Sequence, residues 1–214
     1  MLPDAAAAAG RAAEVIAEAV RAARGSFALA VSGGESPLAM FRRLAVEPLE
    51  WERGGIWQVD ERVAPDGDPD RNLGALVAAL PERARDAVRP MPVTAADLEA
   101  AAWGYAQTLP EVLDVVHLGL GADGHTASLV PGDPVLEVGD RDVAVTGEYR
   151  GRRRMTFTYR LLDRAPFALW LVTGGDKALM LPRLLDADPS IPAGRVRTAR
   201  QLVVADAAAA AALT

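Results

Sequence analysis

The sequence predicts an α/β fold: a single-domain, three-layer α/β/α arrangement with a mostly parallel, Rossmann-like sheet and helices on both faces. Two observations support this prediction. Short apolar segments of the kind that form buried parallel strands recur along the chain, and segments with a helical pattern separate nearly all of them. The 214 residues contain no linker, internal repeat or charge block. We therefore expect one domain over residues 1–214.

In the N-terminal half, helices and strands alternate from the first residues. An alanine-rich, amphipathic stretch after Asp4 predicts a helix that ends near Gly25. Ser36 followed by Pro37 is typical of a helix N-cap and a first helical position. The elements expected after the first helix are a strand over 27–31, a helix from Ser36 to about Leu44, a strand over 56–59, and helices over 73–80 and 95–108.

The C-terminal half continues this alternation. An apolar strand over 115–120 leads into a glycine-rich loop, where residues 126–129 predict one helical turn stopped by Pro131. Two strand-like segments, 143–145 and 155–158, flank a basic turn (Arg150, Arg152, Arg153, Arg154). The remaining elements expected are a strand over 167–172, a helix through Lys177 to Leu181, a strand over 202–204 and an alanine-rich helix after Asp206.

Composition and charge restrict the functions that the chain can have. Hydrophobic residues make up 50% and charged residues 24%, as in ordinary globular proteins. The chain has no cysteine, which excludes thiolate nucleophiles and cysteine-based metal sites and fits a cytoplasmic location. The net charge of −6 argues against general nucleic-acid binding. The N-terminus does not resemble a signal peptide, and no apolar run reaches the roughly 18 residues that span a bilayer. We therefore expect the protein to bind neither nucleic acid nor a membrane.

The glycine-rich loop after the 115–120 strand carries an acid and a base. Asp123 and His125 lie among Gly119, Gly121 and Gly124. A flexible backbone that holds an imidazole at the end of a buried strand is a common way for α/β enzymes to present a catalytic group. We therefore predict that this is the catalytic loop.

The same loop also matches a dinucleotide-binding pattern, Gly-x-Gly-x-x-Gly over 119–124, with Asp140 near the position of a ribose-binding acid. That pattern requires the glycines to open a crossover connection of roughly a dozen residues, usually a helix. Only Thr126–Val130 separates the last glycine from Pro131, so no full helix fits. Nicotinamide or flavin binding is therefore disfavoured, and we expect no cofactor.

Four polar loops follow strands at the expected carboxyl edge of the sheet, where α/β proteins bind ligands. Two of them combine glycines with a helix N-terminus, which favours an anion, and Arg62 and Lys177 add positive charges. A phosphate carries close to two negative charges at pH 7, and charge-assisted hydrogen bonds contribute roughly 1.5–3 kcal/mol each. A phosphorylated small molecule is the expected ligand. The four loops are Ser32-Gly33-Gly34, Asp60-Glu61-Arg62, Gly121–His125 and Thr173–Lys177.

Each of these features also has a structural explanation. Taken alone, Gly33-Gly34 is better explained as a tight turn, and Lys177 as a surface residue. His117 lies inside an apolar run, which predicts a packed core histidine. Convergence of the four loops at one edge favours the functional interpretation. With two histidines and no multidentate carboxylate loop we expect no metal, and the absence of Gly-x-Ser-x-Gly argues against a catalytic serine.

These residues resemble those of the 6-phosphogluconolactonase family, part of a larger group that includes glucosamine-6-phosphate deaminase. The resemblance extends from about Phe27 to the end of the chain. The deaminases would be expected to have a tyrosine in place of Arg62 and Gly-His-Ile-Ala-Phe-Asn over 124–129, so the resemblance favours the lactonase. The segments that carry it are Ser32-Gly-Gly-x-Ser-Pro37, Asp60-Glu-Arg62, Gly119-x-Gly-x-Asp-Gly-His-Thr-Ala-Ser-Leu-x-Pro131, Thr173-Gly-x-x-Lys177 and Ile191-Pro-Ala-Gly-Arg-Val196.

The resemblance implies metal-free hydrolysis of 6-phospho-D-glucono-1,5-lactone to 6-phospho-D-gluconate, the second step of the oxidative pentose phosphate pathway. His125, supported by Asp123, would act as the general base. The expected partner is a small-molecule sugar phosphate, and we expect a cytoplasmic monomer or weak homodimer. The residues expected to bind the substrate are Ser32, Gly33, Gly34, Asp60, Glu61, Arg62, Gly124, Lys177 and Arg195.

Two alternative functions stay open. The first is an isomerase or deaminase that acts on an amino sugar phosphate, with Asp60 or Glu61 as the proton-transfer base. The second is a non-catalytic sugar-phosphate sensor built on the same fold. Such sensors usually carry a DNA-binding segment, for which this chain has no spare residues and no basic face.

Overall fold

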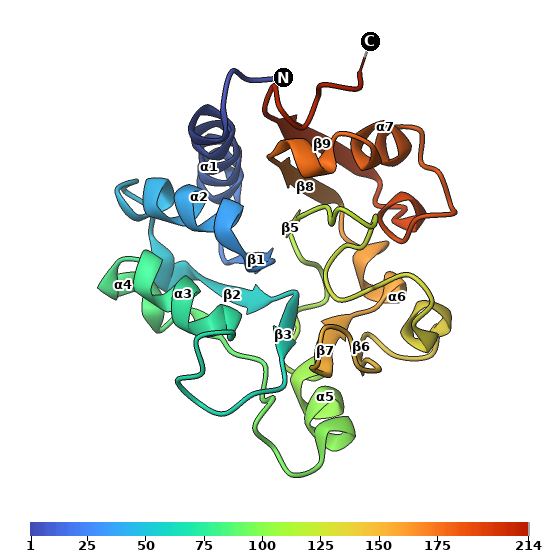
Figure 1. Cartoon of the computed structure of the whole chain (residues 1–214). Helices are drawn as coiled ribbons and strands as arrows, with labels where there is room; N and C mark the ends of the chain where they lie inside the picture. The colour runs from blue at the N-terminus through green and yellow to red at the C-terminus, as the bar shows by residue number, and fades with distance from the viewer. Residues whose placement is uncertain (214) are drawn as a thin grey trace.

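The main sheet of the protein confirms the predicted fold class. The computed structural model describes residues 1–213, apart from the side chain of Glu35. Six strands, each parallel to its neighbours, form a sheet in the order β4-β2-β1-β5-β8-β9 (Figure 1). Their bounds are β1 (Phe27–Val31), β2 (Gly54–Gln58), β4 (Val88–Arg89), β5 (Val115–Leu118), β8 (Phe167–Val172) and β9 (Arg200–Ala205).

The strand order reverses between β1 and β5. From β1 the chain adds β2 and β4 on one side, and it later adds β5, β8 and β9 on the other. The loops that leave the carboxyl ends of β1 and β5 therefore diverge, which opens a crevice at that edge. Ser32 and Gly119 lie where these two loops begin.

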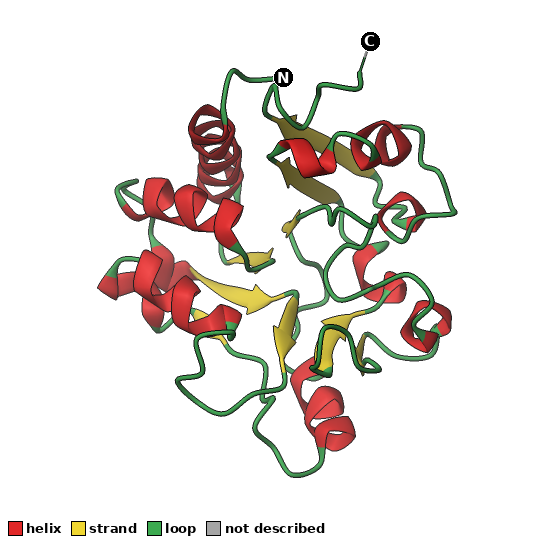
Figure 2. Cartoon of the chain, viewed as in Figure 1, coloured by secondary structure: helices red, strands yellow, loops and turns green. Residues whose placement is uncertain are grey.

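Helices lie on both faces of the main sheet (Figure 2). Successive side chains of a strand point to opposite faces. Leu29 of β1 packs in the cluster that contains α1 and α2, whereas Ala30 packs in the cluster that contains α5 and α7. The helices are α1 (Ala5–Ala22), α2 (Glu35–Ala45), α3 (Asn72–Ala79), α4 (Glu82–Arg85), α5 (Leu98–Ala106), α6 (Tyr159–Leu162) and α7 (Met180–Leu185), with short 3-10 helices η1 (Trp51–Arg53), η2 (Pro134–Glu137), η3 (Gly175–Lys177) and η4 (Ala193–Arg195).

A second, antiparallel sheet of three strands was not predicted. It has the order β3-β7-β6, with β3 (Asp60–Arg62), β7 (Arg154–Phe157) and β6 (Val143–Val145). The prediction that Asp60-Glu61-Arg62 forms a loop after β2 is therefore wrong. Only Val59 separates the two strands, and its carbonyl accepts a hydrogen bond from Phe157 of β7 (2.8 Å). The chain thus passes from one sheet into the other within a single residue.

The start of α2 also differs from the prediction. The helix begins at Glu35, and its N-cap is Gly34, which has a φ of 114°. Glycine adopts this conformation without the steric cost of a Cβ atom. The Ser36 hydroxyl, predicted to cap the helix, instead forms a hydrogen bond of 2.6 Å with the Thr173 hydroxyl after β8. This contact joins two of the predicted ligand-binding loops.

Three other helix predictions are corrected. Residues 126–129 form a tight turn rather than a helical turn, since Ala127 has a φ of 51°. The predicted helix through Lys177 is divided into η3 and α7. The alanine-rich segment after Asp206 forms turns, because alanine propensity alone does not nucleate so short a helix.

The two ends of the described chain lie close together at one side of the molecule (Figure 1). Leu2 pairs with Asp206 in an isolated parallel bridge. Within residues 1–213, no helix has both the length and the apolar character that crossing a membrane requires. The single domain over 1–214 stays a prediction, and Thr214 lies outside the described residues.

Candidate active site

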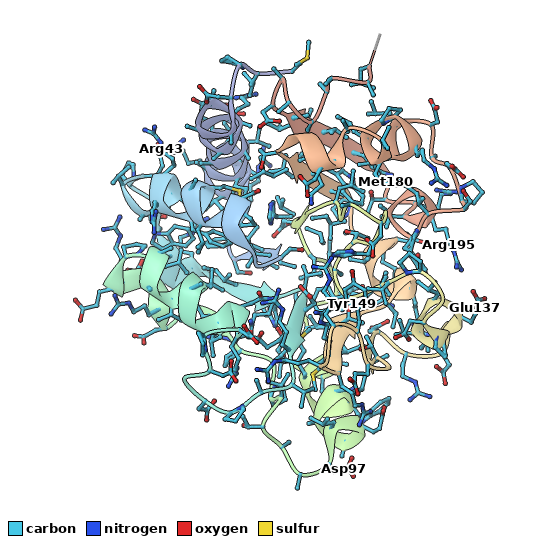
Figure 3. All side chains as sticks on the ribbon, viewed as in Figure 1. Arg43, Asp97, Glu137, Tyr149, Met180 and Arg195 are labelled. Atoms are coloured by element: carbon cyan, nitrogen blue, oxygen red, sulfur yellow. The ribbon has the colours of Figure 1, made fainter. Side chains whose placement is uncertain are left out.

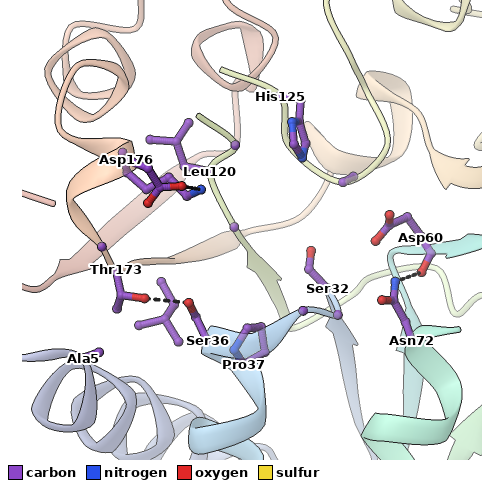
Figure 4. Close-up of a pocket in the computed structure, with 18 of the residues that line it drawn as sticks. Ala5, Ser32, Ser36, Pro37, Asp60, Asn72, Leu120, His125, Thr173 and Asp176 are labelled. Atoms are coloured by element: carbon purple, nitrogen blue, oxygen red, sulfur yellow. Dashed lines mark hydrogen bonds and ion pairs between the residues drawn. The ribbon is translucent and has the colours of Figure 1, made fainter. Parts of the chain in front are cut away.

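A cavity of about 830 Å³ opens where the loops after β1 and β5 diverge (Figure 4). This volume lies within the range of small-molecule sites. In Figure 4, His125 faces Ser32 and Asp60 across the cavity, and Thr173 and Asp176 lie at another side. The predicted site residues that line the cavity are Ser32, Gly33, Gly34, Asp60, Arg62, His125 and Lys177. The four segments predicted to bind the ligand, which are far apart in the sequence, therefore meet at one edge of the main sheet.

His125 is paired with Asp123. Its ring nitrogen Nδ1 lies 2.5 Å from the Asp123 Oδ1, and the same oxygen accepts a hydrogen bond from the His125 backbone N–H (3.1 Å). Although only one residue separates them, the two side chains are in direct contact. The other ring nitrogen, Nε2, makes no hydrogen bond with the described residues, and His125 lines the cavity. The arrangement suits an imidazole that exchanges a proton through Nε2.

The Asp123 carboxylate is held in its ionised form. Partial burial acts to raise its pKa, but the charge of His125 and hydrogen bonds from His125 and Tyr149 outweigh burial and lower the pKa of Asp123 to about 2. Asp123 is therefore negatively charged at neutral pH and able to stabilise a protonated His125.

Positive charge and free backbone donors gather elsewhere in the cavity. Arg62 lies on β3 and Lys177 on η3, where its Nζ contacts the Asp176 carboxylate at 2.5 Å. The backbone N–H groups of Gly33 and Gly34, at the N-terminus of α2, donate no hydrogen bond to another described residue. Together with the helix dipole, these groups can bind an anion such as a phosphate.

Asp60 is a buried carboxyl group in the cavity wall. It is 8% exposed, and its Oδ2 accepts a hydrogen bond of 2.6 Å from the Ser128 hydroxyl. Burial raises the pKa of Asp60, against the effects of Ser128 and of the nearby arginine charges. It is the one carboxyl group of the predicted Asp60-Glu61 pair that lines the cavity.

Glu61 does not line the cavity, and the structure gives it another role. The residue is fully buried, and its carboxylate accepts hydrogen bonds from the backbone N–H groups of Asn72 and Leu73 (2.8 Å each) and from Gln58 (2.9 Å). Glu61 therefore caps the start of α3 and joins it to β3. Its predicted contact with substrate is corrected, because the carboxylate points into the protein.

Two further predicted binding residues lie outside the cavity lining. The Arg195 guanidinium stacks on the Tyr159 ring at 4.7 Å from its centroid and contacts Glu137 at 3.2 Å. Gly124 has a φ of 84°, and its carbonyl accepts a hydrogen bond from Ala193 (2.9 Å). Gly124 thus shapes the loop that carries His125, whereas Arg195 is engaged away from the cavity.

Tyr149, Arg150 and Arg154 are among the residues that line the cavity and that the sequence analysis did not assign to the site. Arg154 is only 8% exposed, and its Nε makes no hydrogen bond with the described residues. The basic turn that contains these arginines was noted in the sequence. Its position opposite the glycine-rich loop was not predictable, because it depends on the pairing of β3 with β7.

His117 lies in the core, as its apolar surroundings predicted. It is 0% exposed, and burial lowers its pKa to about 3. Among the described residues, no group of three or more histidines and carboxylates is placed to hold a metal ion.

The fold and the site together define a class: an α/β protein with an acid–base pair and an anion-binding surface at the carboxyl edge of a parallel sheet. The chain matches the family model described as glucosamine-6-phosphate isomerases/6-phosphogluconolactonase over residues 3–204. It is 37% identical over 186 residues to a protein of Synechocystis sp. named 6-phosphogluconolactonase, covering 78% of this chain and 76% of that one. A protein of Rhizobium meliloti with the same name is 38% identical over 175 residues, which cover 75% and 74% of the two chains.

Solved structures agree with this match. A crystal structure of a 6-phosphogluconolactonase from Shewanella baltica superposes with a TM-score of 0.86, covers 96% of each chain and shares 26% of its sequence with this protein. The chain therefore belongs to the glucosamine-6-phosphate isomerase/6-phosphogluconolactonase family.

Proposed function

We propose that this protein hydrolyses 6-phospho-D-glucono-1,5-lactone to 6-phospho-D-gluconate, the second step of the oxidative pentose phosphate pathway. One observation carries the proposal: His125, paired with Asp123, lines the same cavity as Arg62 and Lys177. An acid–base group and an anion-binding surface are what hydrolysis of a phosphorylated lactone requires. The names of the relatives described above support the same activity.

The proposed reaction begins with a water molecule between His125 and the lactone carbonyl. Nε2 of neutral His125 accepts a proton as the water oxygen bonds to the carbonyl carbon. When the tetrahedral intermediate collapses, the bond from that carbon to the ring oxygen breaks, and the imidazolium returns its proton to the ring oxygen. Asp123 stabilises the imidazolium between these steps. Arg62, Lys177 and the N–H groups of Gly33 and Gly34 hold the phosphate.

The deaminase alternative has less support. Of its two candidate bases, Glu61 is buried and already accepts several hydrogen bonds, so Asp60 would have to act alone. Ammonia release from glucosamine 6-phosphate distinguishes this activity from lactone hydrolysis.

The test is acid release from freshly prepared 6-phosphogluconolactone, corrected for spontaneous ring opening. Replacing the base (His125→Ala) should lower kcat by about 10²- to 10⁴-fold, the usual contribution of general-base catalysis. The Kd of 6-phosphogluconate should stay within about threefold of the parental value, because the groups that hold the phosphate are unchanged. Near-parental turnover in this variant contradicts the role of His125. Ammonia release without lactone hydrolysis contradicts the proposed function itself.

A further inference from the structure

Tyr149 makes a contact behind the acid–base pair that the proposed reaction does not yet use. It lies at the tip of the β6–β7 hairpin, where it pairs with Arg152 in an isolated antiparallel bridge. Its hydroxyl donates a hydrogen bond of 2.9 Å to the Asp123 Oδ2. The other carboxylate oxygen of Asp123 contacts His125. One oxygen of Asp123 is therefore bound by His125, through its ring and its backbone N–H, and Tyr149 holds the other oxygen, which does not contact the imidazole.

The Tyr149 ring is itself fixed on several sides. Figure 3 shows Tyr149 near the middle of the molecule, close to β7. The ring meets His125 edge to face, with 5.8 Å between the ring centroids and 63° between their planes. The guanidinium groups of Arg154 and Arg150 lie 4.8 Å and 5.1 Å from its centroid. Cation–π contacts of this length restrict the ring.

The donor in the Tyr149–Asp123 contact is well defined. Burial, together with the hydrogen bond to the negative Asp123, raises the pKa of Tyr149 above its ordinary value. The phenol therefore keeps its proton at neutral pH and donates a hydrogen bond to the carboxylate. Asp123 in turn accepts from Nδ1 of His125, which leaves the lone pair of Nε2 free to face the cavity.

We propose that Tyr149 is a positioning residue, which holds the Asp123 carboxylate so that His125 presents Nε2 to the cavity. This inference rests on the proposed function, in which Nε2 accepts the proton of water. Without the phenol, Asp123 is free to rotate toward solvent, since its side chain is 36% exposed. The imidazole would then spend less time in the productive tautomer and orientation.

The variant Tyr149→Phe tests the proposal, because it keeps the ring and its contacts with Arg150 and Arg154 and removes only the hydroxyl. We expect kcat to fall roughly 3- to 10-fold, as for an ordinary hydrogen bond and less than for a buried one to a charged group, since the site is partly exposed. KM should change by less than about twofold. The acid limb of the kcat profile should move to lower pH, because an Asp123 carboxylate that spends less time against the imidazole stabilises protonated His125 less.

Tyr159→Phe provides a matched control. The Tyr159 hydroxyl also donates a hydrogen bond of 2.9 Å, to the Pro192 carbonyl, and its ring lies 4.7 Å from an arginine guanidinium. This tyrosine does not line the cavity. The control variant should keep the parental kcat and pH profile. If losing any tyrosine hydroxyl had the same general effect, kcat would fall equally in both variants. That result would overturn the proposal.

A double-mutant cycle with Asp123→Asn shows whether Tyr149 acts through Asp123. If it does, adding Tyr149→Phe to Asp123→Asn changes kcat by less than about twofold, because the charged acceptor is already lost. Multiplicative effects, or a rise in KM that accounts for the loss, indicate a direct contact between Tyr149 and the substrate and overturn the proposal.

A second readout needs no substrate. The chain has 2 histidines, and His117 stays neutral because burial lowers its pKa to about 3. A change in the pH response of the histidine signals in the NMR spectrum therefore reports on His125. Tyr149→Phe should move the midpoint of this response to lower pH, and an unchanged midpoint contradicts the proposal. This result is independent of lactonase activity, whereas failure of the parental protein to open the lactone contradicts only the proposed function.

Discussion

Gly121 lies against the two side chains that carry the proposed chemistry. A Cβ atom at this position would lie 2.0 Å from Nδ1 of His125 and 2.7 Å from Oδ1 of Asp123. Its backbone also accepts a hydrogen bond from Gly124 (3.0 Å) and donates one to the His125 carbonyl (2.8 Å). Any side chain here would therefore displace the pair from its present position. The glycine is needed for space, not for an unusual φ.

Gly121→Ala should therefore lower kcat by about 10²-fold or more, since a displacement of about 1 Å in a catalytic group can cost this much. The Kd of 6-phosphogluconate should change by only a few-fold. Gly139→Ala is the control, because a Cβ atom there has no neighbour within 4 Å. The kcat of both variants is measured by steady-state kinetics of lactone hydrolysis. Parental turnover in Gly121→Ala would show that the loop adjusts and that the close approach does not matter.

At the scale of the secondary-structure elements, the groups proposed to hold the phosphate (Arg62, Lys177 and the N–H groups of Gly33 and Gly34, the proposed anchor) come from several elements. Arg62 lies on β3, Lys177 on η3, and Gly33-Gly34 precede α2. The buried Glu61 joins β3 to the first N–H groups of α3, and this fixes the strand that carries Arg62. The anchor is thus held by the core of the protein although its charges face the cavity.

Lys177→Ala and Arg62→Ala should each weaken the binding of 6-phosphogluconate by about 10- to 100-fold, because each removes one charge-assisted contact. The loss should be smaller at high ionic strength, which screens the interaction. Calorimetric titration of the product measures the Kd, with Arg164→Ala as the control, since Arg164 pairs with Asp142. Unchanged product affinity in both cavity variants would contradict the assignment of the anchor.

At the scale of the whole molecule, His117 couples stability to pH. It lies on β5 between Val31 of β1 and Leu169 of β8, with the Phe41 ring at 6.4 Å, and neither ring nitrogen has a hydrogen-bond partner among the described residues. Burial lowers its pKa to about 3, against about 6.5 in an unfolded chain. Between these values the unfolded state binds the extra proton, so stability falls as the pH falls.

His117→Leu should remove this dependence. Relative to the variant, the free energy of unfolding of the parental protein should fall by about 1.4 kcal/mol for each pH unit between pH 6 and pH 4. Denaturant unfolding at a series of pH values measures the difference. Parallel stability curves for the parental protein and His117→Leu would show that His117 is not the responsible group.

The sequence alone determined much of the fold and the general place of the site. The strands over 27–31, 143–145 and 167–172 have the predicted bounds, because apolar runs bounded by polar or turn residues are local signals. The glycine-rich loops could be assigned to one edge, since parallel strands direct their carboxyl ends the same way. The family resemblance depends on residues within short segments, which can be recognised from the sequence without a structure.

Only the tertiary structure decided which polar side chains face the cavity. Asp60, Glu61 and Arg62 are consecutive, yet pairing of β3 with β7 leaves Asp60 and Arg62 in the cavity wall and turns Glu61 into the core. The same pairing brings the hairpin with Tyr149 and Arg154 to the loop that carries Asp123 and His125, whereas Arg195 stacks on Tyr159 away from the cavity. Such contacts join residues far apart in the chain, so they depend on strand pairing and packing and leave no local pattern in the sequence.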